Sequence, residues 1–168
     1  MQTISNNKVQ DAARVIIIRG LILLFFLVLV YSCNSATKDP EVSILETNIR
    51  RYNRALIDAY KELSVDPLQE IASEREMGKV NMIIMGFRAK NQYMESELKG
   101  IEFKEIKRNK EDSADVETKE AWRFRYMDKK TGQEVKPWAE AEYKLSYHII
   151  KNQGKWLVGT VEFVKEKK

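Results

Sequence analysis

Two side chains carry chemistry that occurs only once in this chain of 168 residues: the imidazole of His148 and the thiol of Cys33. An imidazole exchanges protons near neutral pH, so His148 is the first candidate for acid–base catalysis. In the strand expected around it, His148 faces the same side as Lys144 and Ser146, and no acid stands at an obvious partner position. We therefore predict an exposed or interface histidine, and no catalytic residue is assigned.

The thiol of Cys33 follows a long apolar run. Residues 20–31 are mostly Leu, Ile, Val and Phe, and the basic residues Lys8, Arg14 and Arg19 precede or flank that run. A positive segment, a short apolar core and a small residue before a cleavage point are the parts of a secretory signal. The pattern predicts an N-terminal segment that directs export.

The end of this run is more specific. Val30-Tyr31-Ser32-Cys33 has an aliphatic residue three positions before the cysteine and a small residue directly before it, and this resembles the lipobox of bacterial lipoproteins. The resemblance implies cleavage between Ser32 and Cys33 and a diacylglyceryl group on Cys33. Because each buried acyl methylene contributes roughly 0.8 kcal/mol, several chains on one cysteine hold a small domain on a bilayer.

An uncut single span is the alternative. Val15 to Ser32 is nearly as long as the roughly 20 apolar residues that a span requires, and Arg19 near one end can extend its charge to the interface. Since positive charge stays in the cytoplasm, both interpretations place the rest of the chain outside it. We expect a signal peptide or anchor over residues 1–33, a tether over 34–42 and an α+β domain over 43–168. The expected location is the cell envelope, on the outer face of the cytoplasmic membrane or on the outer membrane.

Composition narrows the function classes. The chain has 29 Lys and Arg against 25 Asp and Glu; three basic residues and one acidic residue lie in the first 33, which leaves 26 against 24. This near-neutral balance argues against a nucleic-acid binder. One Cys and one His exclude an intrachain disulfide and Cys/His zinc clusters. The sequence also has no Gly-rich phosphate loop, so we expect neither a metal nor a cofactor.

Aromatic residues gather in the C-terminal half. The simple explanation is packing within a sheet. The more specific explanation is an aromatic-lined pocket or an exposed patch that contacts a partner. Arg123, Arg125 and Lys144 could add a basic strip to the outer sheet face. The candidates for pocket or partner contacts are Trp122, Tyr126, Trp138, Tyr147, His148 and Trp156, among which Trp138, after Pro137, is the best exposed contact.

Three helices are predicted first. Ser43 and Glu46 match a capping box, and apolar residues spaced by three and four follow, which indicates an amphipathic helix over about 44–62. The pair Asp66-Pro67 is typical of the start of a short second helix.

Ser73 and Glu76 form another capping box that opens a third helix, expected to end near residues 93–97. Its Met82 and Met85 are interpreted as core filler.

Four strands are predicted after Gly100, where the apolar period changes toward two. They are expected over about 101–107, 116–126, 135–150 and 155–164, joined by short turns. Consecutive strands with short turns pair antiparallel, so the fold class is α+β, with the helices packed on a curved four-stranded meander.

This order of elements resembles the nuclear transport factor 2-like fold over roughly residues 43–165. The ending Tyr143-x-Leu145-x-Tyr147 followed by Gly154-Lys155-Trp156-x-Val158 looks like the last hairpin of that superfamily. The resemblance implies a cone-like domain. It does not choose a function, because the superfamily contains enzymes, binding proteins and non-catalytic membrane-associated domains.

The sequence therefore favours a lipid-anchored, non-enzymatic interaction or assembly module, held by membrane lipid through Cys33 and bound to an unidentified protein partner. A homodimer is compatible with this interpretation. Two alternatives stay open: a cone domain that binds a small ligand or is weakly enzymatic, and a retained single-span subunit of a membrane complex.

Replacing the thiol tests the anchor. We expect Cys33→Ala to abolish metabolic labelling of the chain with a fatty acid, because the acyl acceptor is removed. Unchanged labelling would contradict acylation at Cys33, and an intact N-terminus in protein purified from membranes would favour the uncut span.

Overall fold

The computed structural model describes residues 39–110 and 112–164. The predicted leader, Ser32 and Cys33 lie outside these residues. No helix in the described part of the chain combines the length and apolar character that crossing a bilayer requires. The elements in chain order are α2 (Pro40–Glu62), the 3₁₀ turn η1 (Asp66–Leu68), α3 (Glu74–Ala89), β1 (Gln92–Lys110), β2 (Ser113–Asp128), β3 (Glu134–Asn152) and β4 (Lys155–Phe163).

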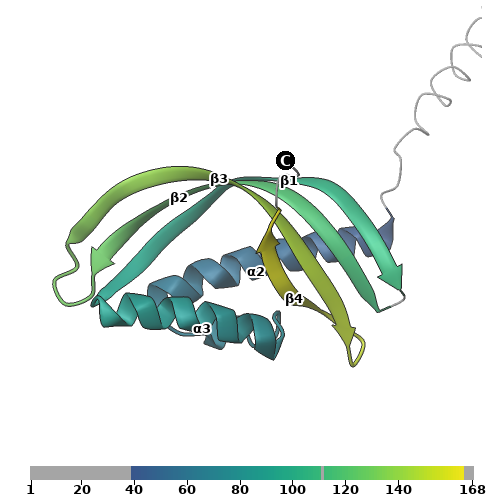
Figure 1. Cartoon of the computed structure of the whole chain (residues 1–168), viewed down its shortest axis with the longest axis horizontal. Helices are drawn as coiled ribbons and strands as arrows, with labels where there is room; N and C mark the ends of the chain where they lie inside the picture. The colour runs from purple at the N-terminus through teal and green to yellow at the C-terminus, as the bar shows by residue number, and fades with distance from the viewer. Residues whose placement is uncertain (1–38, 111, 165–168) are drawn as a thin grey trace, which may run out of the picture. The chain divides into compact units, whose positions relative to one another are not determined.

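The four strands form one antiparallel sheet in the order β1-β2-β3-β4. Figure 1 shows the sheet arching over α2 and α3, which lie beneath its concave face. The predicted α+β class and meander are confirmed. Of the three predicted helices, the second is only a three-residue 3₁₀ turn.

The first helix begins earlier than the Ser43 capping box predicts. Asp39 Oδ1 accepts a hydrogen bond from the backbone N–H of Glu41 at 2.9 Å, and Pro40 occupies the first turn. An aspartate cap followed by proline is a favoured helix start. The start at Ser43 is therefore wrong, and α2 takes up the last residues of the predicted tether.

The start of α3 is confirmed, but only half of its capping box forms. Ser73 Oγ accepts from the backbone N–H of Glu76 at 3.2 Å. The Glu76 carboxylate does not reach back: it accepts from Tyr52 OH at 2.8 Å and from the Val161 N–H at 3.2 Å. This buried carboxylate therefore ties together α2, α3 and β4.

The end predicted for the third helix is wrong. The helix stops at Ala89, and Asn91 adopts φ 55°, in the left-handed region that Asn tolerates better than most residues. Asn91 Nδ2 donates to Asp128 Oδ2 at 3.1 Å, and Lys129 N donates to the Asn91 carbonyl at 2.9 Å. These bonds place the start of β1 beside the end of β2, so Gly100 lies within a strand.

The two methionines of α3 are not core filler. Met82 is 73% exposed and Met85 is 58% exposed. The buried residues of the helix include Val80 and Ile84, and at about 100° per residue Met82 lies roughly 200° from each of them. α3 is thus buried along one stripe only.

The core lies between α2, α3 and the concave face of the sheet. Its large buried side chains include Leu45, Ile49, Ile84, Tyr147 and Ile149. Every buried residue of this core falls within residues 45–158, and burying each large apolar side chain contributes roughly 1.5–3 kcal/mol. A chain that starts at residue 34 therefore keeps every core residue that the structure describes, and we expect it to fold without the leader.

Candidate functional site

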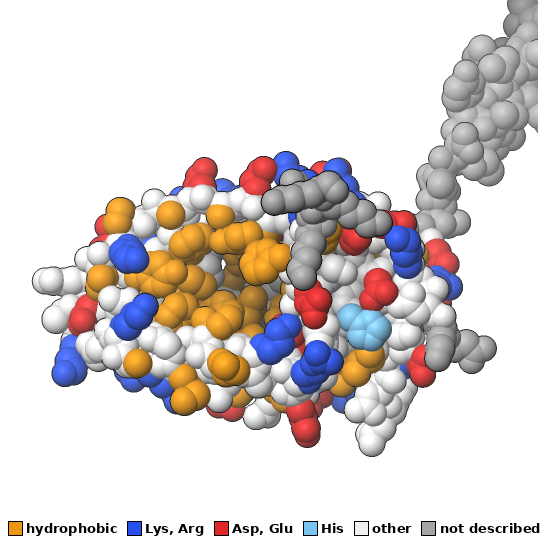
Figure 2. Space-filling model, in the orientation of Figure 1, with side chains coloured by type: hydrophobic (Ala, Val, Ile, Leu, Met, Phe, Trp, Pro, Cys, Tyr) orange, Lys and Arg blue, Asp and Glu red, His pale blue; other side chains and the backbone are white. Residues whose placement is uncertain are grey.

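A cleft of ≈ 300 Å³ opens between the helices and the concave face of the sheet. Figure 2 shows a hollow lined mostly by hydrophobic side chains on the corresponding side of the domain. Six of the residues that line the cleft are aromatic: Tyr60, Trp122, Phe124, Tyr126, Tyr143 and Phe163.

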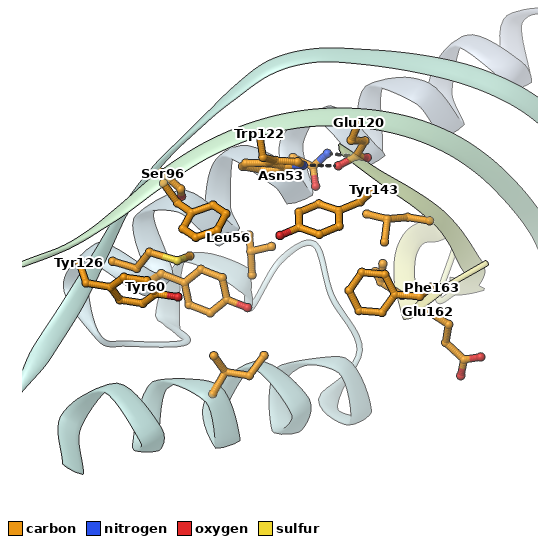
Figure 3. Close-up of a pocket in the computed structure, with 15 residues that line it drawn as sticks. Asn53, Leu56, Tyr60, Ser96, Glu120, Trp122, Tyr126, Tyr143, Glu162 and Phe163 are labelled. Atoms are coloured by element: carbon orange, nitrogen blue, oxygen red, sulfur yellow. Dashed lines mark hydrogen bonds between the residues drawn. The ribbon is translucent and has the colours of Figure 1, made fainter. Parts of the chain in front are cut away.

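The rings stand on several sides of the cleft. In the close-up of Figure 3, Trp122 lies above the space, Tyr60 and Tyr126 on one side, and Tyr143 and Phe163 on the other. Tyr143 and Phe163 pack edge to face with ring centres 5.6 Å apart, a favoured aromatic geometry. Aromatic residues of α2, β2, β3 and β4 therefore form the walls of a single cleft.

A buried carboxylate lies at the inner end of the cleft. Glu120, on β2, is 1% exposed. Its Oε1 accepts from Asn53 Nδ2 at 3.1 Å, Thr118 Oγ1 at 3.0 Å and Tyr147 OH at 2.7 Å, while its Oε2 accepts from Trp122 Nε1 at 2.8 Å. Burying a charge is costly unless it is hydrogen-bonded, and these four donors supply that compensation.

The hydroxyls of Tyr147 and Tyr60 stay protonated. Burial, reinforced by the charge of Glu120, raises the pKa of Tyr147 well above its ordinary value. Burial, with a smaller effect from Glu76, also raises the pKa of Tyr60. Both hydroxyls therefore act as neutral hydrogen-bonding groups at physiological pH.

One polar atom of the cleft wall is unsatisfied. Ser96 lines the cleft, and its Oγ is buried with no hydrogen-bond partner among the described residues. Buried side-chain oxygens in native structures usually have a partner, so Ser96 marks a position where a bound molecule could complete a hydrogen bond.

The structure brings three of the six predicted contact residues together. Trp122 and Tyr126 line the cleft, and Tyr147 lies next to it through the Glu120 network. Trp138, His148 and Trp156 lie elsewhere. Trp156 instead has the ammonium of Lys151 5.4 Å from its ring centre.

Trp138 lies on the other face of the sheet, where it is 38% exposed. The guanidinium carbons of Arg123 and Arg125 lie 4.6 and 4.9 Å from its ring centre. Arg123 also pairs with Glu97, and Arg125 with Glu95. The predicted basic strip is therefore charge-compensated at both arginines.

The expectation that His148 lacks an acidic partner is wrong. The register of β2 and β3 places it opposite Asp115, and its Nδ1 lies 2.7 Å from Asp115 Oδ1. Asp115 also accepts from Asn109 Nδ2 at 2.7 Å. The pair is partly exposed and is not among the residues that line the cleft.

Sequence reasoning missed the polar centre of the cleft. Glu120 follows the inward-facing Val116 and Thr118 in the alternation of β2, so a charged residue occupies an inward position. Asn53 likewise lies beside Tyr52 and Leu56 on the apolar stripe of α2. Both positions carry a detectable signal, because a polar residue on a buried face needs a partner.

The described residues contain no group of three or more His, Cys, Asp or Glu arranged to hold a metal ion. The cleft itself contributes aromatic rings, hydroxyls and carboxylates. These groups can form hydrogen bonds and apolar contacts with a bound molecule.

The Asp115–His148 pair generates a pH prediction. Partial burial opposes ionisation of Asp115, but hydrogen bonds from Asn109 and His148 outweigh it and lower its pKa. A lowered folded-state pKa contributes stability above the unfolded-state pKa and loses it as pH falls through the folded value. We expect the destabilisation caused by Asp115→Asn in chemical denaturation to be present at about pH 6 and to shrink progressively as the pH falls below about 4, the unfolded-state value. Asp58→Asn, at an exposed position on α2, is the control, and a deficit that does not change with pH would contradict the assignment.

Comparison with solved structures identifies the fold. The chain is similar to the intermembrane-space region of the chloroplast protein ARC6, with TM-score 0.63, 11% identity, and coverage of 77% of this chain and 98% of that one. It is also similar to an Ntf2-like protein involved in plasmid conjugation, with TM-score 0.50 and 11% identity, covering 73% of this chain and 48% of that one. No family model matches the sequence, and no curated protein does. The domain has a nuclear transport factor 2-like fold.

Proposed function

We propose that this chain is a lipid-anchored, extracytoplasmic domain that binds a small, largely apolar molecule in its cleft and does not transform it. The observation that carries the proposal is the open aromatic cleft with a hydrogen-bonded carboxylate at its inner end. The N-terminal apolar run that ends at Cys33 supports the anchored, exported part. A similar solved domain from an intermembrane space is consistent with a location beyond a membrane.

The size of the cleft favours a small ligand. Its volume of ≈ 300 Å³ is at the lower end of the roughly 300–1,000 Å³ usual for ligand pockets. Such pockets combine apolar walls with a few placed polar groups, and Ser96, Tyr143 and Glu120 supply such groups here. A molecule with one apolar body and one polar end fits this arrangement.

The state of the polar groups favours binding over catalysis. Three hydrogen bonds already occupy Glu120 Oε1, whereas a general base needs a lone pair directed at the substrate. The imidazole of His148 is paired with Asp115 away from the cleft lining. Glu120 Oε1 and the His148 imidazole are thus committed to structural contacts, while Glu120 Oε2 has one donor, the Trp122 indole N–H.

Two neighbouring positions on α3 test the cleft. Ile83 lines the cleft and is 47% exposed, whereas Met82 is more exposed and does not line it. The measurement uses the chain from residue 34 and a neutral fluorescent dye such as Nile red. We expect Ile83→Arg to weaken dye binding by about tenfold or more, because the bound dye would remove water from the introduced guanidinium group. Met82→Arg should bind as the unsubstituted chain does. Equal behaviour of the two variants would refute the cleft as the binding site.

A second candidate function is self-assembly, favoured by the outward face of α3. Met82 and Met85 are exposed there, and nothing lies within 4 Å of a Cβ built at Gly78 or Gly86. Gly in a helix costs about 1 kcal/mol relative to Ala, while its small size lets another helix approach closely. The occupant we propose is the same face of a second copy, since the exposed methionines and the small glycines of one α3 could pack against those of another about a twofold axis.

Sedimentation of the chain from residue 34 tests this assembly. We expect a dimer at micromolar concentration that Met85→Lys converts to monomer, because two lysines would face each other across the axis. Val135→Lys, which adds a lysine at an exposed position on β3, should leave the dimer unchanged. A chain that is monomeric at every concentration would exclude this function.

A further inference from the structure

We infer that the ligand of the cleft is a small organic cation: an amine or quaternary ammonium group carried on an apolar body. The inference rests on the proposed binding function and adds the charge of the ligand. It derives from four features of the cleft lining: the negative charge of its carboxylates, the free acceptor position on Glu120 Oε2, the aromatic rings, and the aliphatic walls with the buried Ser96 Oγ.

Among the described residues, the charged groups that line the cleft have one sign. They are the carboxylates of Glu120 and Glu162, and no described Lys, Arg or His is in the lining. Glu162 lies at the rim in Figure 3, where its carboxylate turns outward, and Glu120 lies at the inner end. A charge in a poorly solvated space acts more strongly than one in water, so Glu120 sets the local potential. An anion would meet this potential unfavourably, and a cation would be attracted.

Glu120 keeps the capacity to accept a further hydrogen bond. Its Oε1 is used by three donors, but its Oε2 has one, the indole N–H of Trp122. A carboxylate has about four acceptor positions in total, two on each oxygen. The free position on Oε2 suits an N–H group or a close cationic methyl group.

The aromatic rings suit the same ligand. A cation is attracted to the face of Trp, Tyr or Phe within about 6 Å of the ring centre. Trp122, Tyr60, Tyr126 and Tyr143 surround the space in Figure 3. One cleft ring already attracts a cation of this chain, since Lys136 Nζ lies 5.5 Å from the centre of Tyr126. An ammonium group that enters the cleft loses its contacts with water, and contacts with the faces of several aromatic rings would replace them.

The rest of the lining fits an apolar body with a donor. Leu56, Met94 and Leu145 provide aliphatic walls. The buried Ser96 Oγ has no partner, and a hydroxyl oxygen accepts hydrogen bonds. A primary or secondary amine could therefore satisfy Ser96 as well as Glu120, which a purely hydrocarbon ligand cannot do.

A pair of isosteric probes tests the inference. Phenyltrimethylammonium and tert-butylbenzene have the same shape and differ by nitrogen in place of carbon, hence by one positive charge. Using the chain from residue 34, titration followed by the NMR signal of the Trp122 indole N–H gives both affinities. We expect the cation to bind about tenfold tighter, as cation–π contacts in a desolvated site allow. Equal affinities, or tighter binding of the hydrocarbon, would overturn this inference and leave the binding function standing. Binding of neither probe would count against the binding function itself.

Substitutions locate the source of the preference. Glu120→Gln keeps the shape and removes the charge, so the preference for the cation should fall to about twofold or less, while tert-butylbenzene still binds. Glu140→Gln, at an exposed position on β3 outside the cleft lining, is the matched control and should keep the full preference. If Glu120→Gln does not fold, Tyr143→Leu serves instead: it removes one ring of the cleft lining and should lower affinity for the cation more than for the hydrocarbon. An unchanged preference in a folded Glu120→Gln variant would exclude Glu120 as the recognition group.

Discussion

The buried carboxylate of Glu120 constrains the arrangement of the domain. Removing such a group from water costs several kcal/mol unless hydrogen bonds replace its hydration. The donors that replace it come from different elements: Asn53 from α2, Thr118 and Trp122 from β2, and Tyr147 from β3. Satisfying one charge therefore fixes the helix against the two central strands. The same bonds orient the Trp122 ring that forms part of the cleft wall.

The cleft exists because the sheet bends in the region around Glu120 and Trp122. The pairing of β1 with β2 shifts register between Leu98 and Gly100, and that of β2 with β3 shifts between Phe124 and Tyr126. An extra residue in one strand bends it and increases its local twist. The strands arch away from α3 in Figure 1, and the aromatic side chains cover the concave surface without filling it.

Local sequence patterns predicted the elements whose signals are local. The alternation that puts Trp122 and Tyr126 on one face and Arg123 and Arg125 on the other holds in the structure. The turn at Gly154, with φ 80°, also lies between the third and fourth strands, where a short turn was predicted. The helix starts show the limit of such patterns. Asp39-Pro40 caps a long helix with its side chain, while the same pair at Asp66-Pro67 opens only a 3₁₀ turn without a side-chain cap. The residues after each Asp-Pro pair, rather than the pair itself, decide whether a long helix forms.

Contacts between strands and the choice of buried face could not be predicted in this way. The partner of His148 depends on the register of β2 against β3, which places Asp115 opposite it although 33 residues separate them. The exposure of Met82 depends on α3 packing along a single stripe. The Glu120 site combines both difficulties, because its donors are distant in sequence and each is an ordinary residue when taken alone. A polar residue that interrupts an inward-facing apolar pattern is nevertheless a usable signal: burying it is tolerated only where partners converge, and convergent polar groups within an apolar cleft are also what a ligand needs.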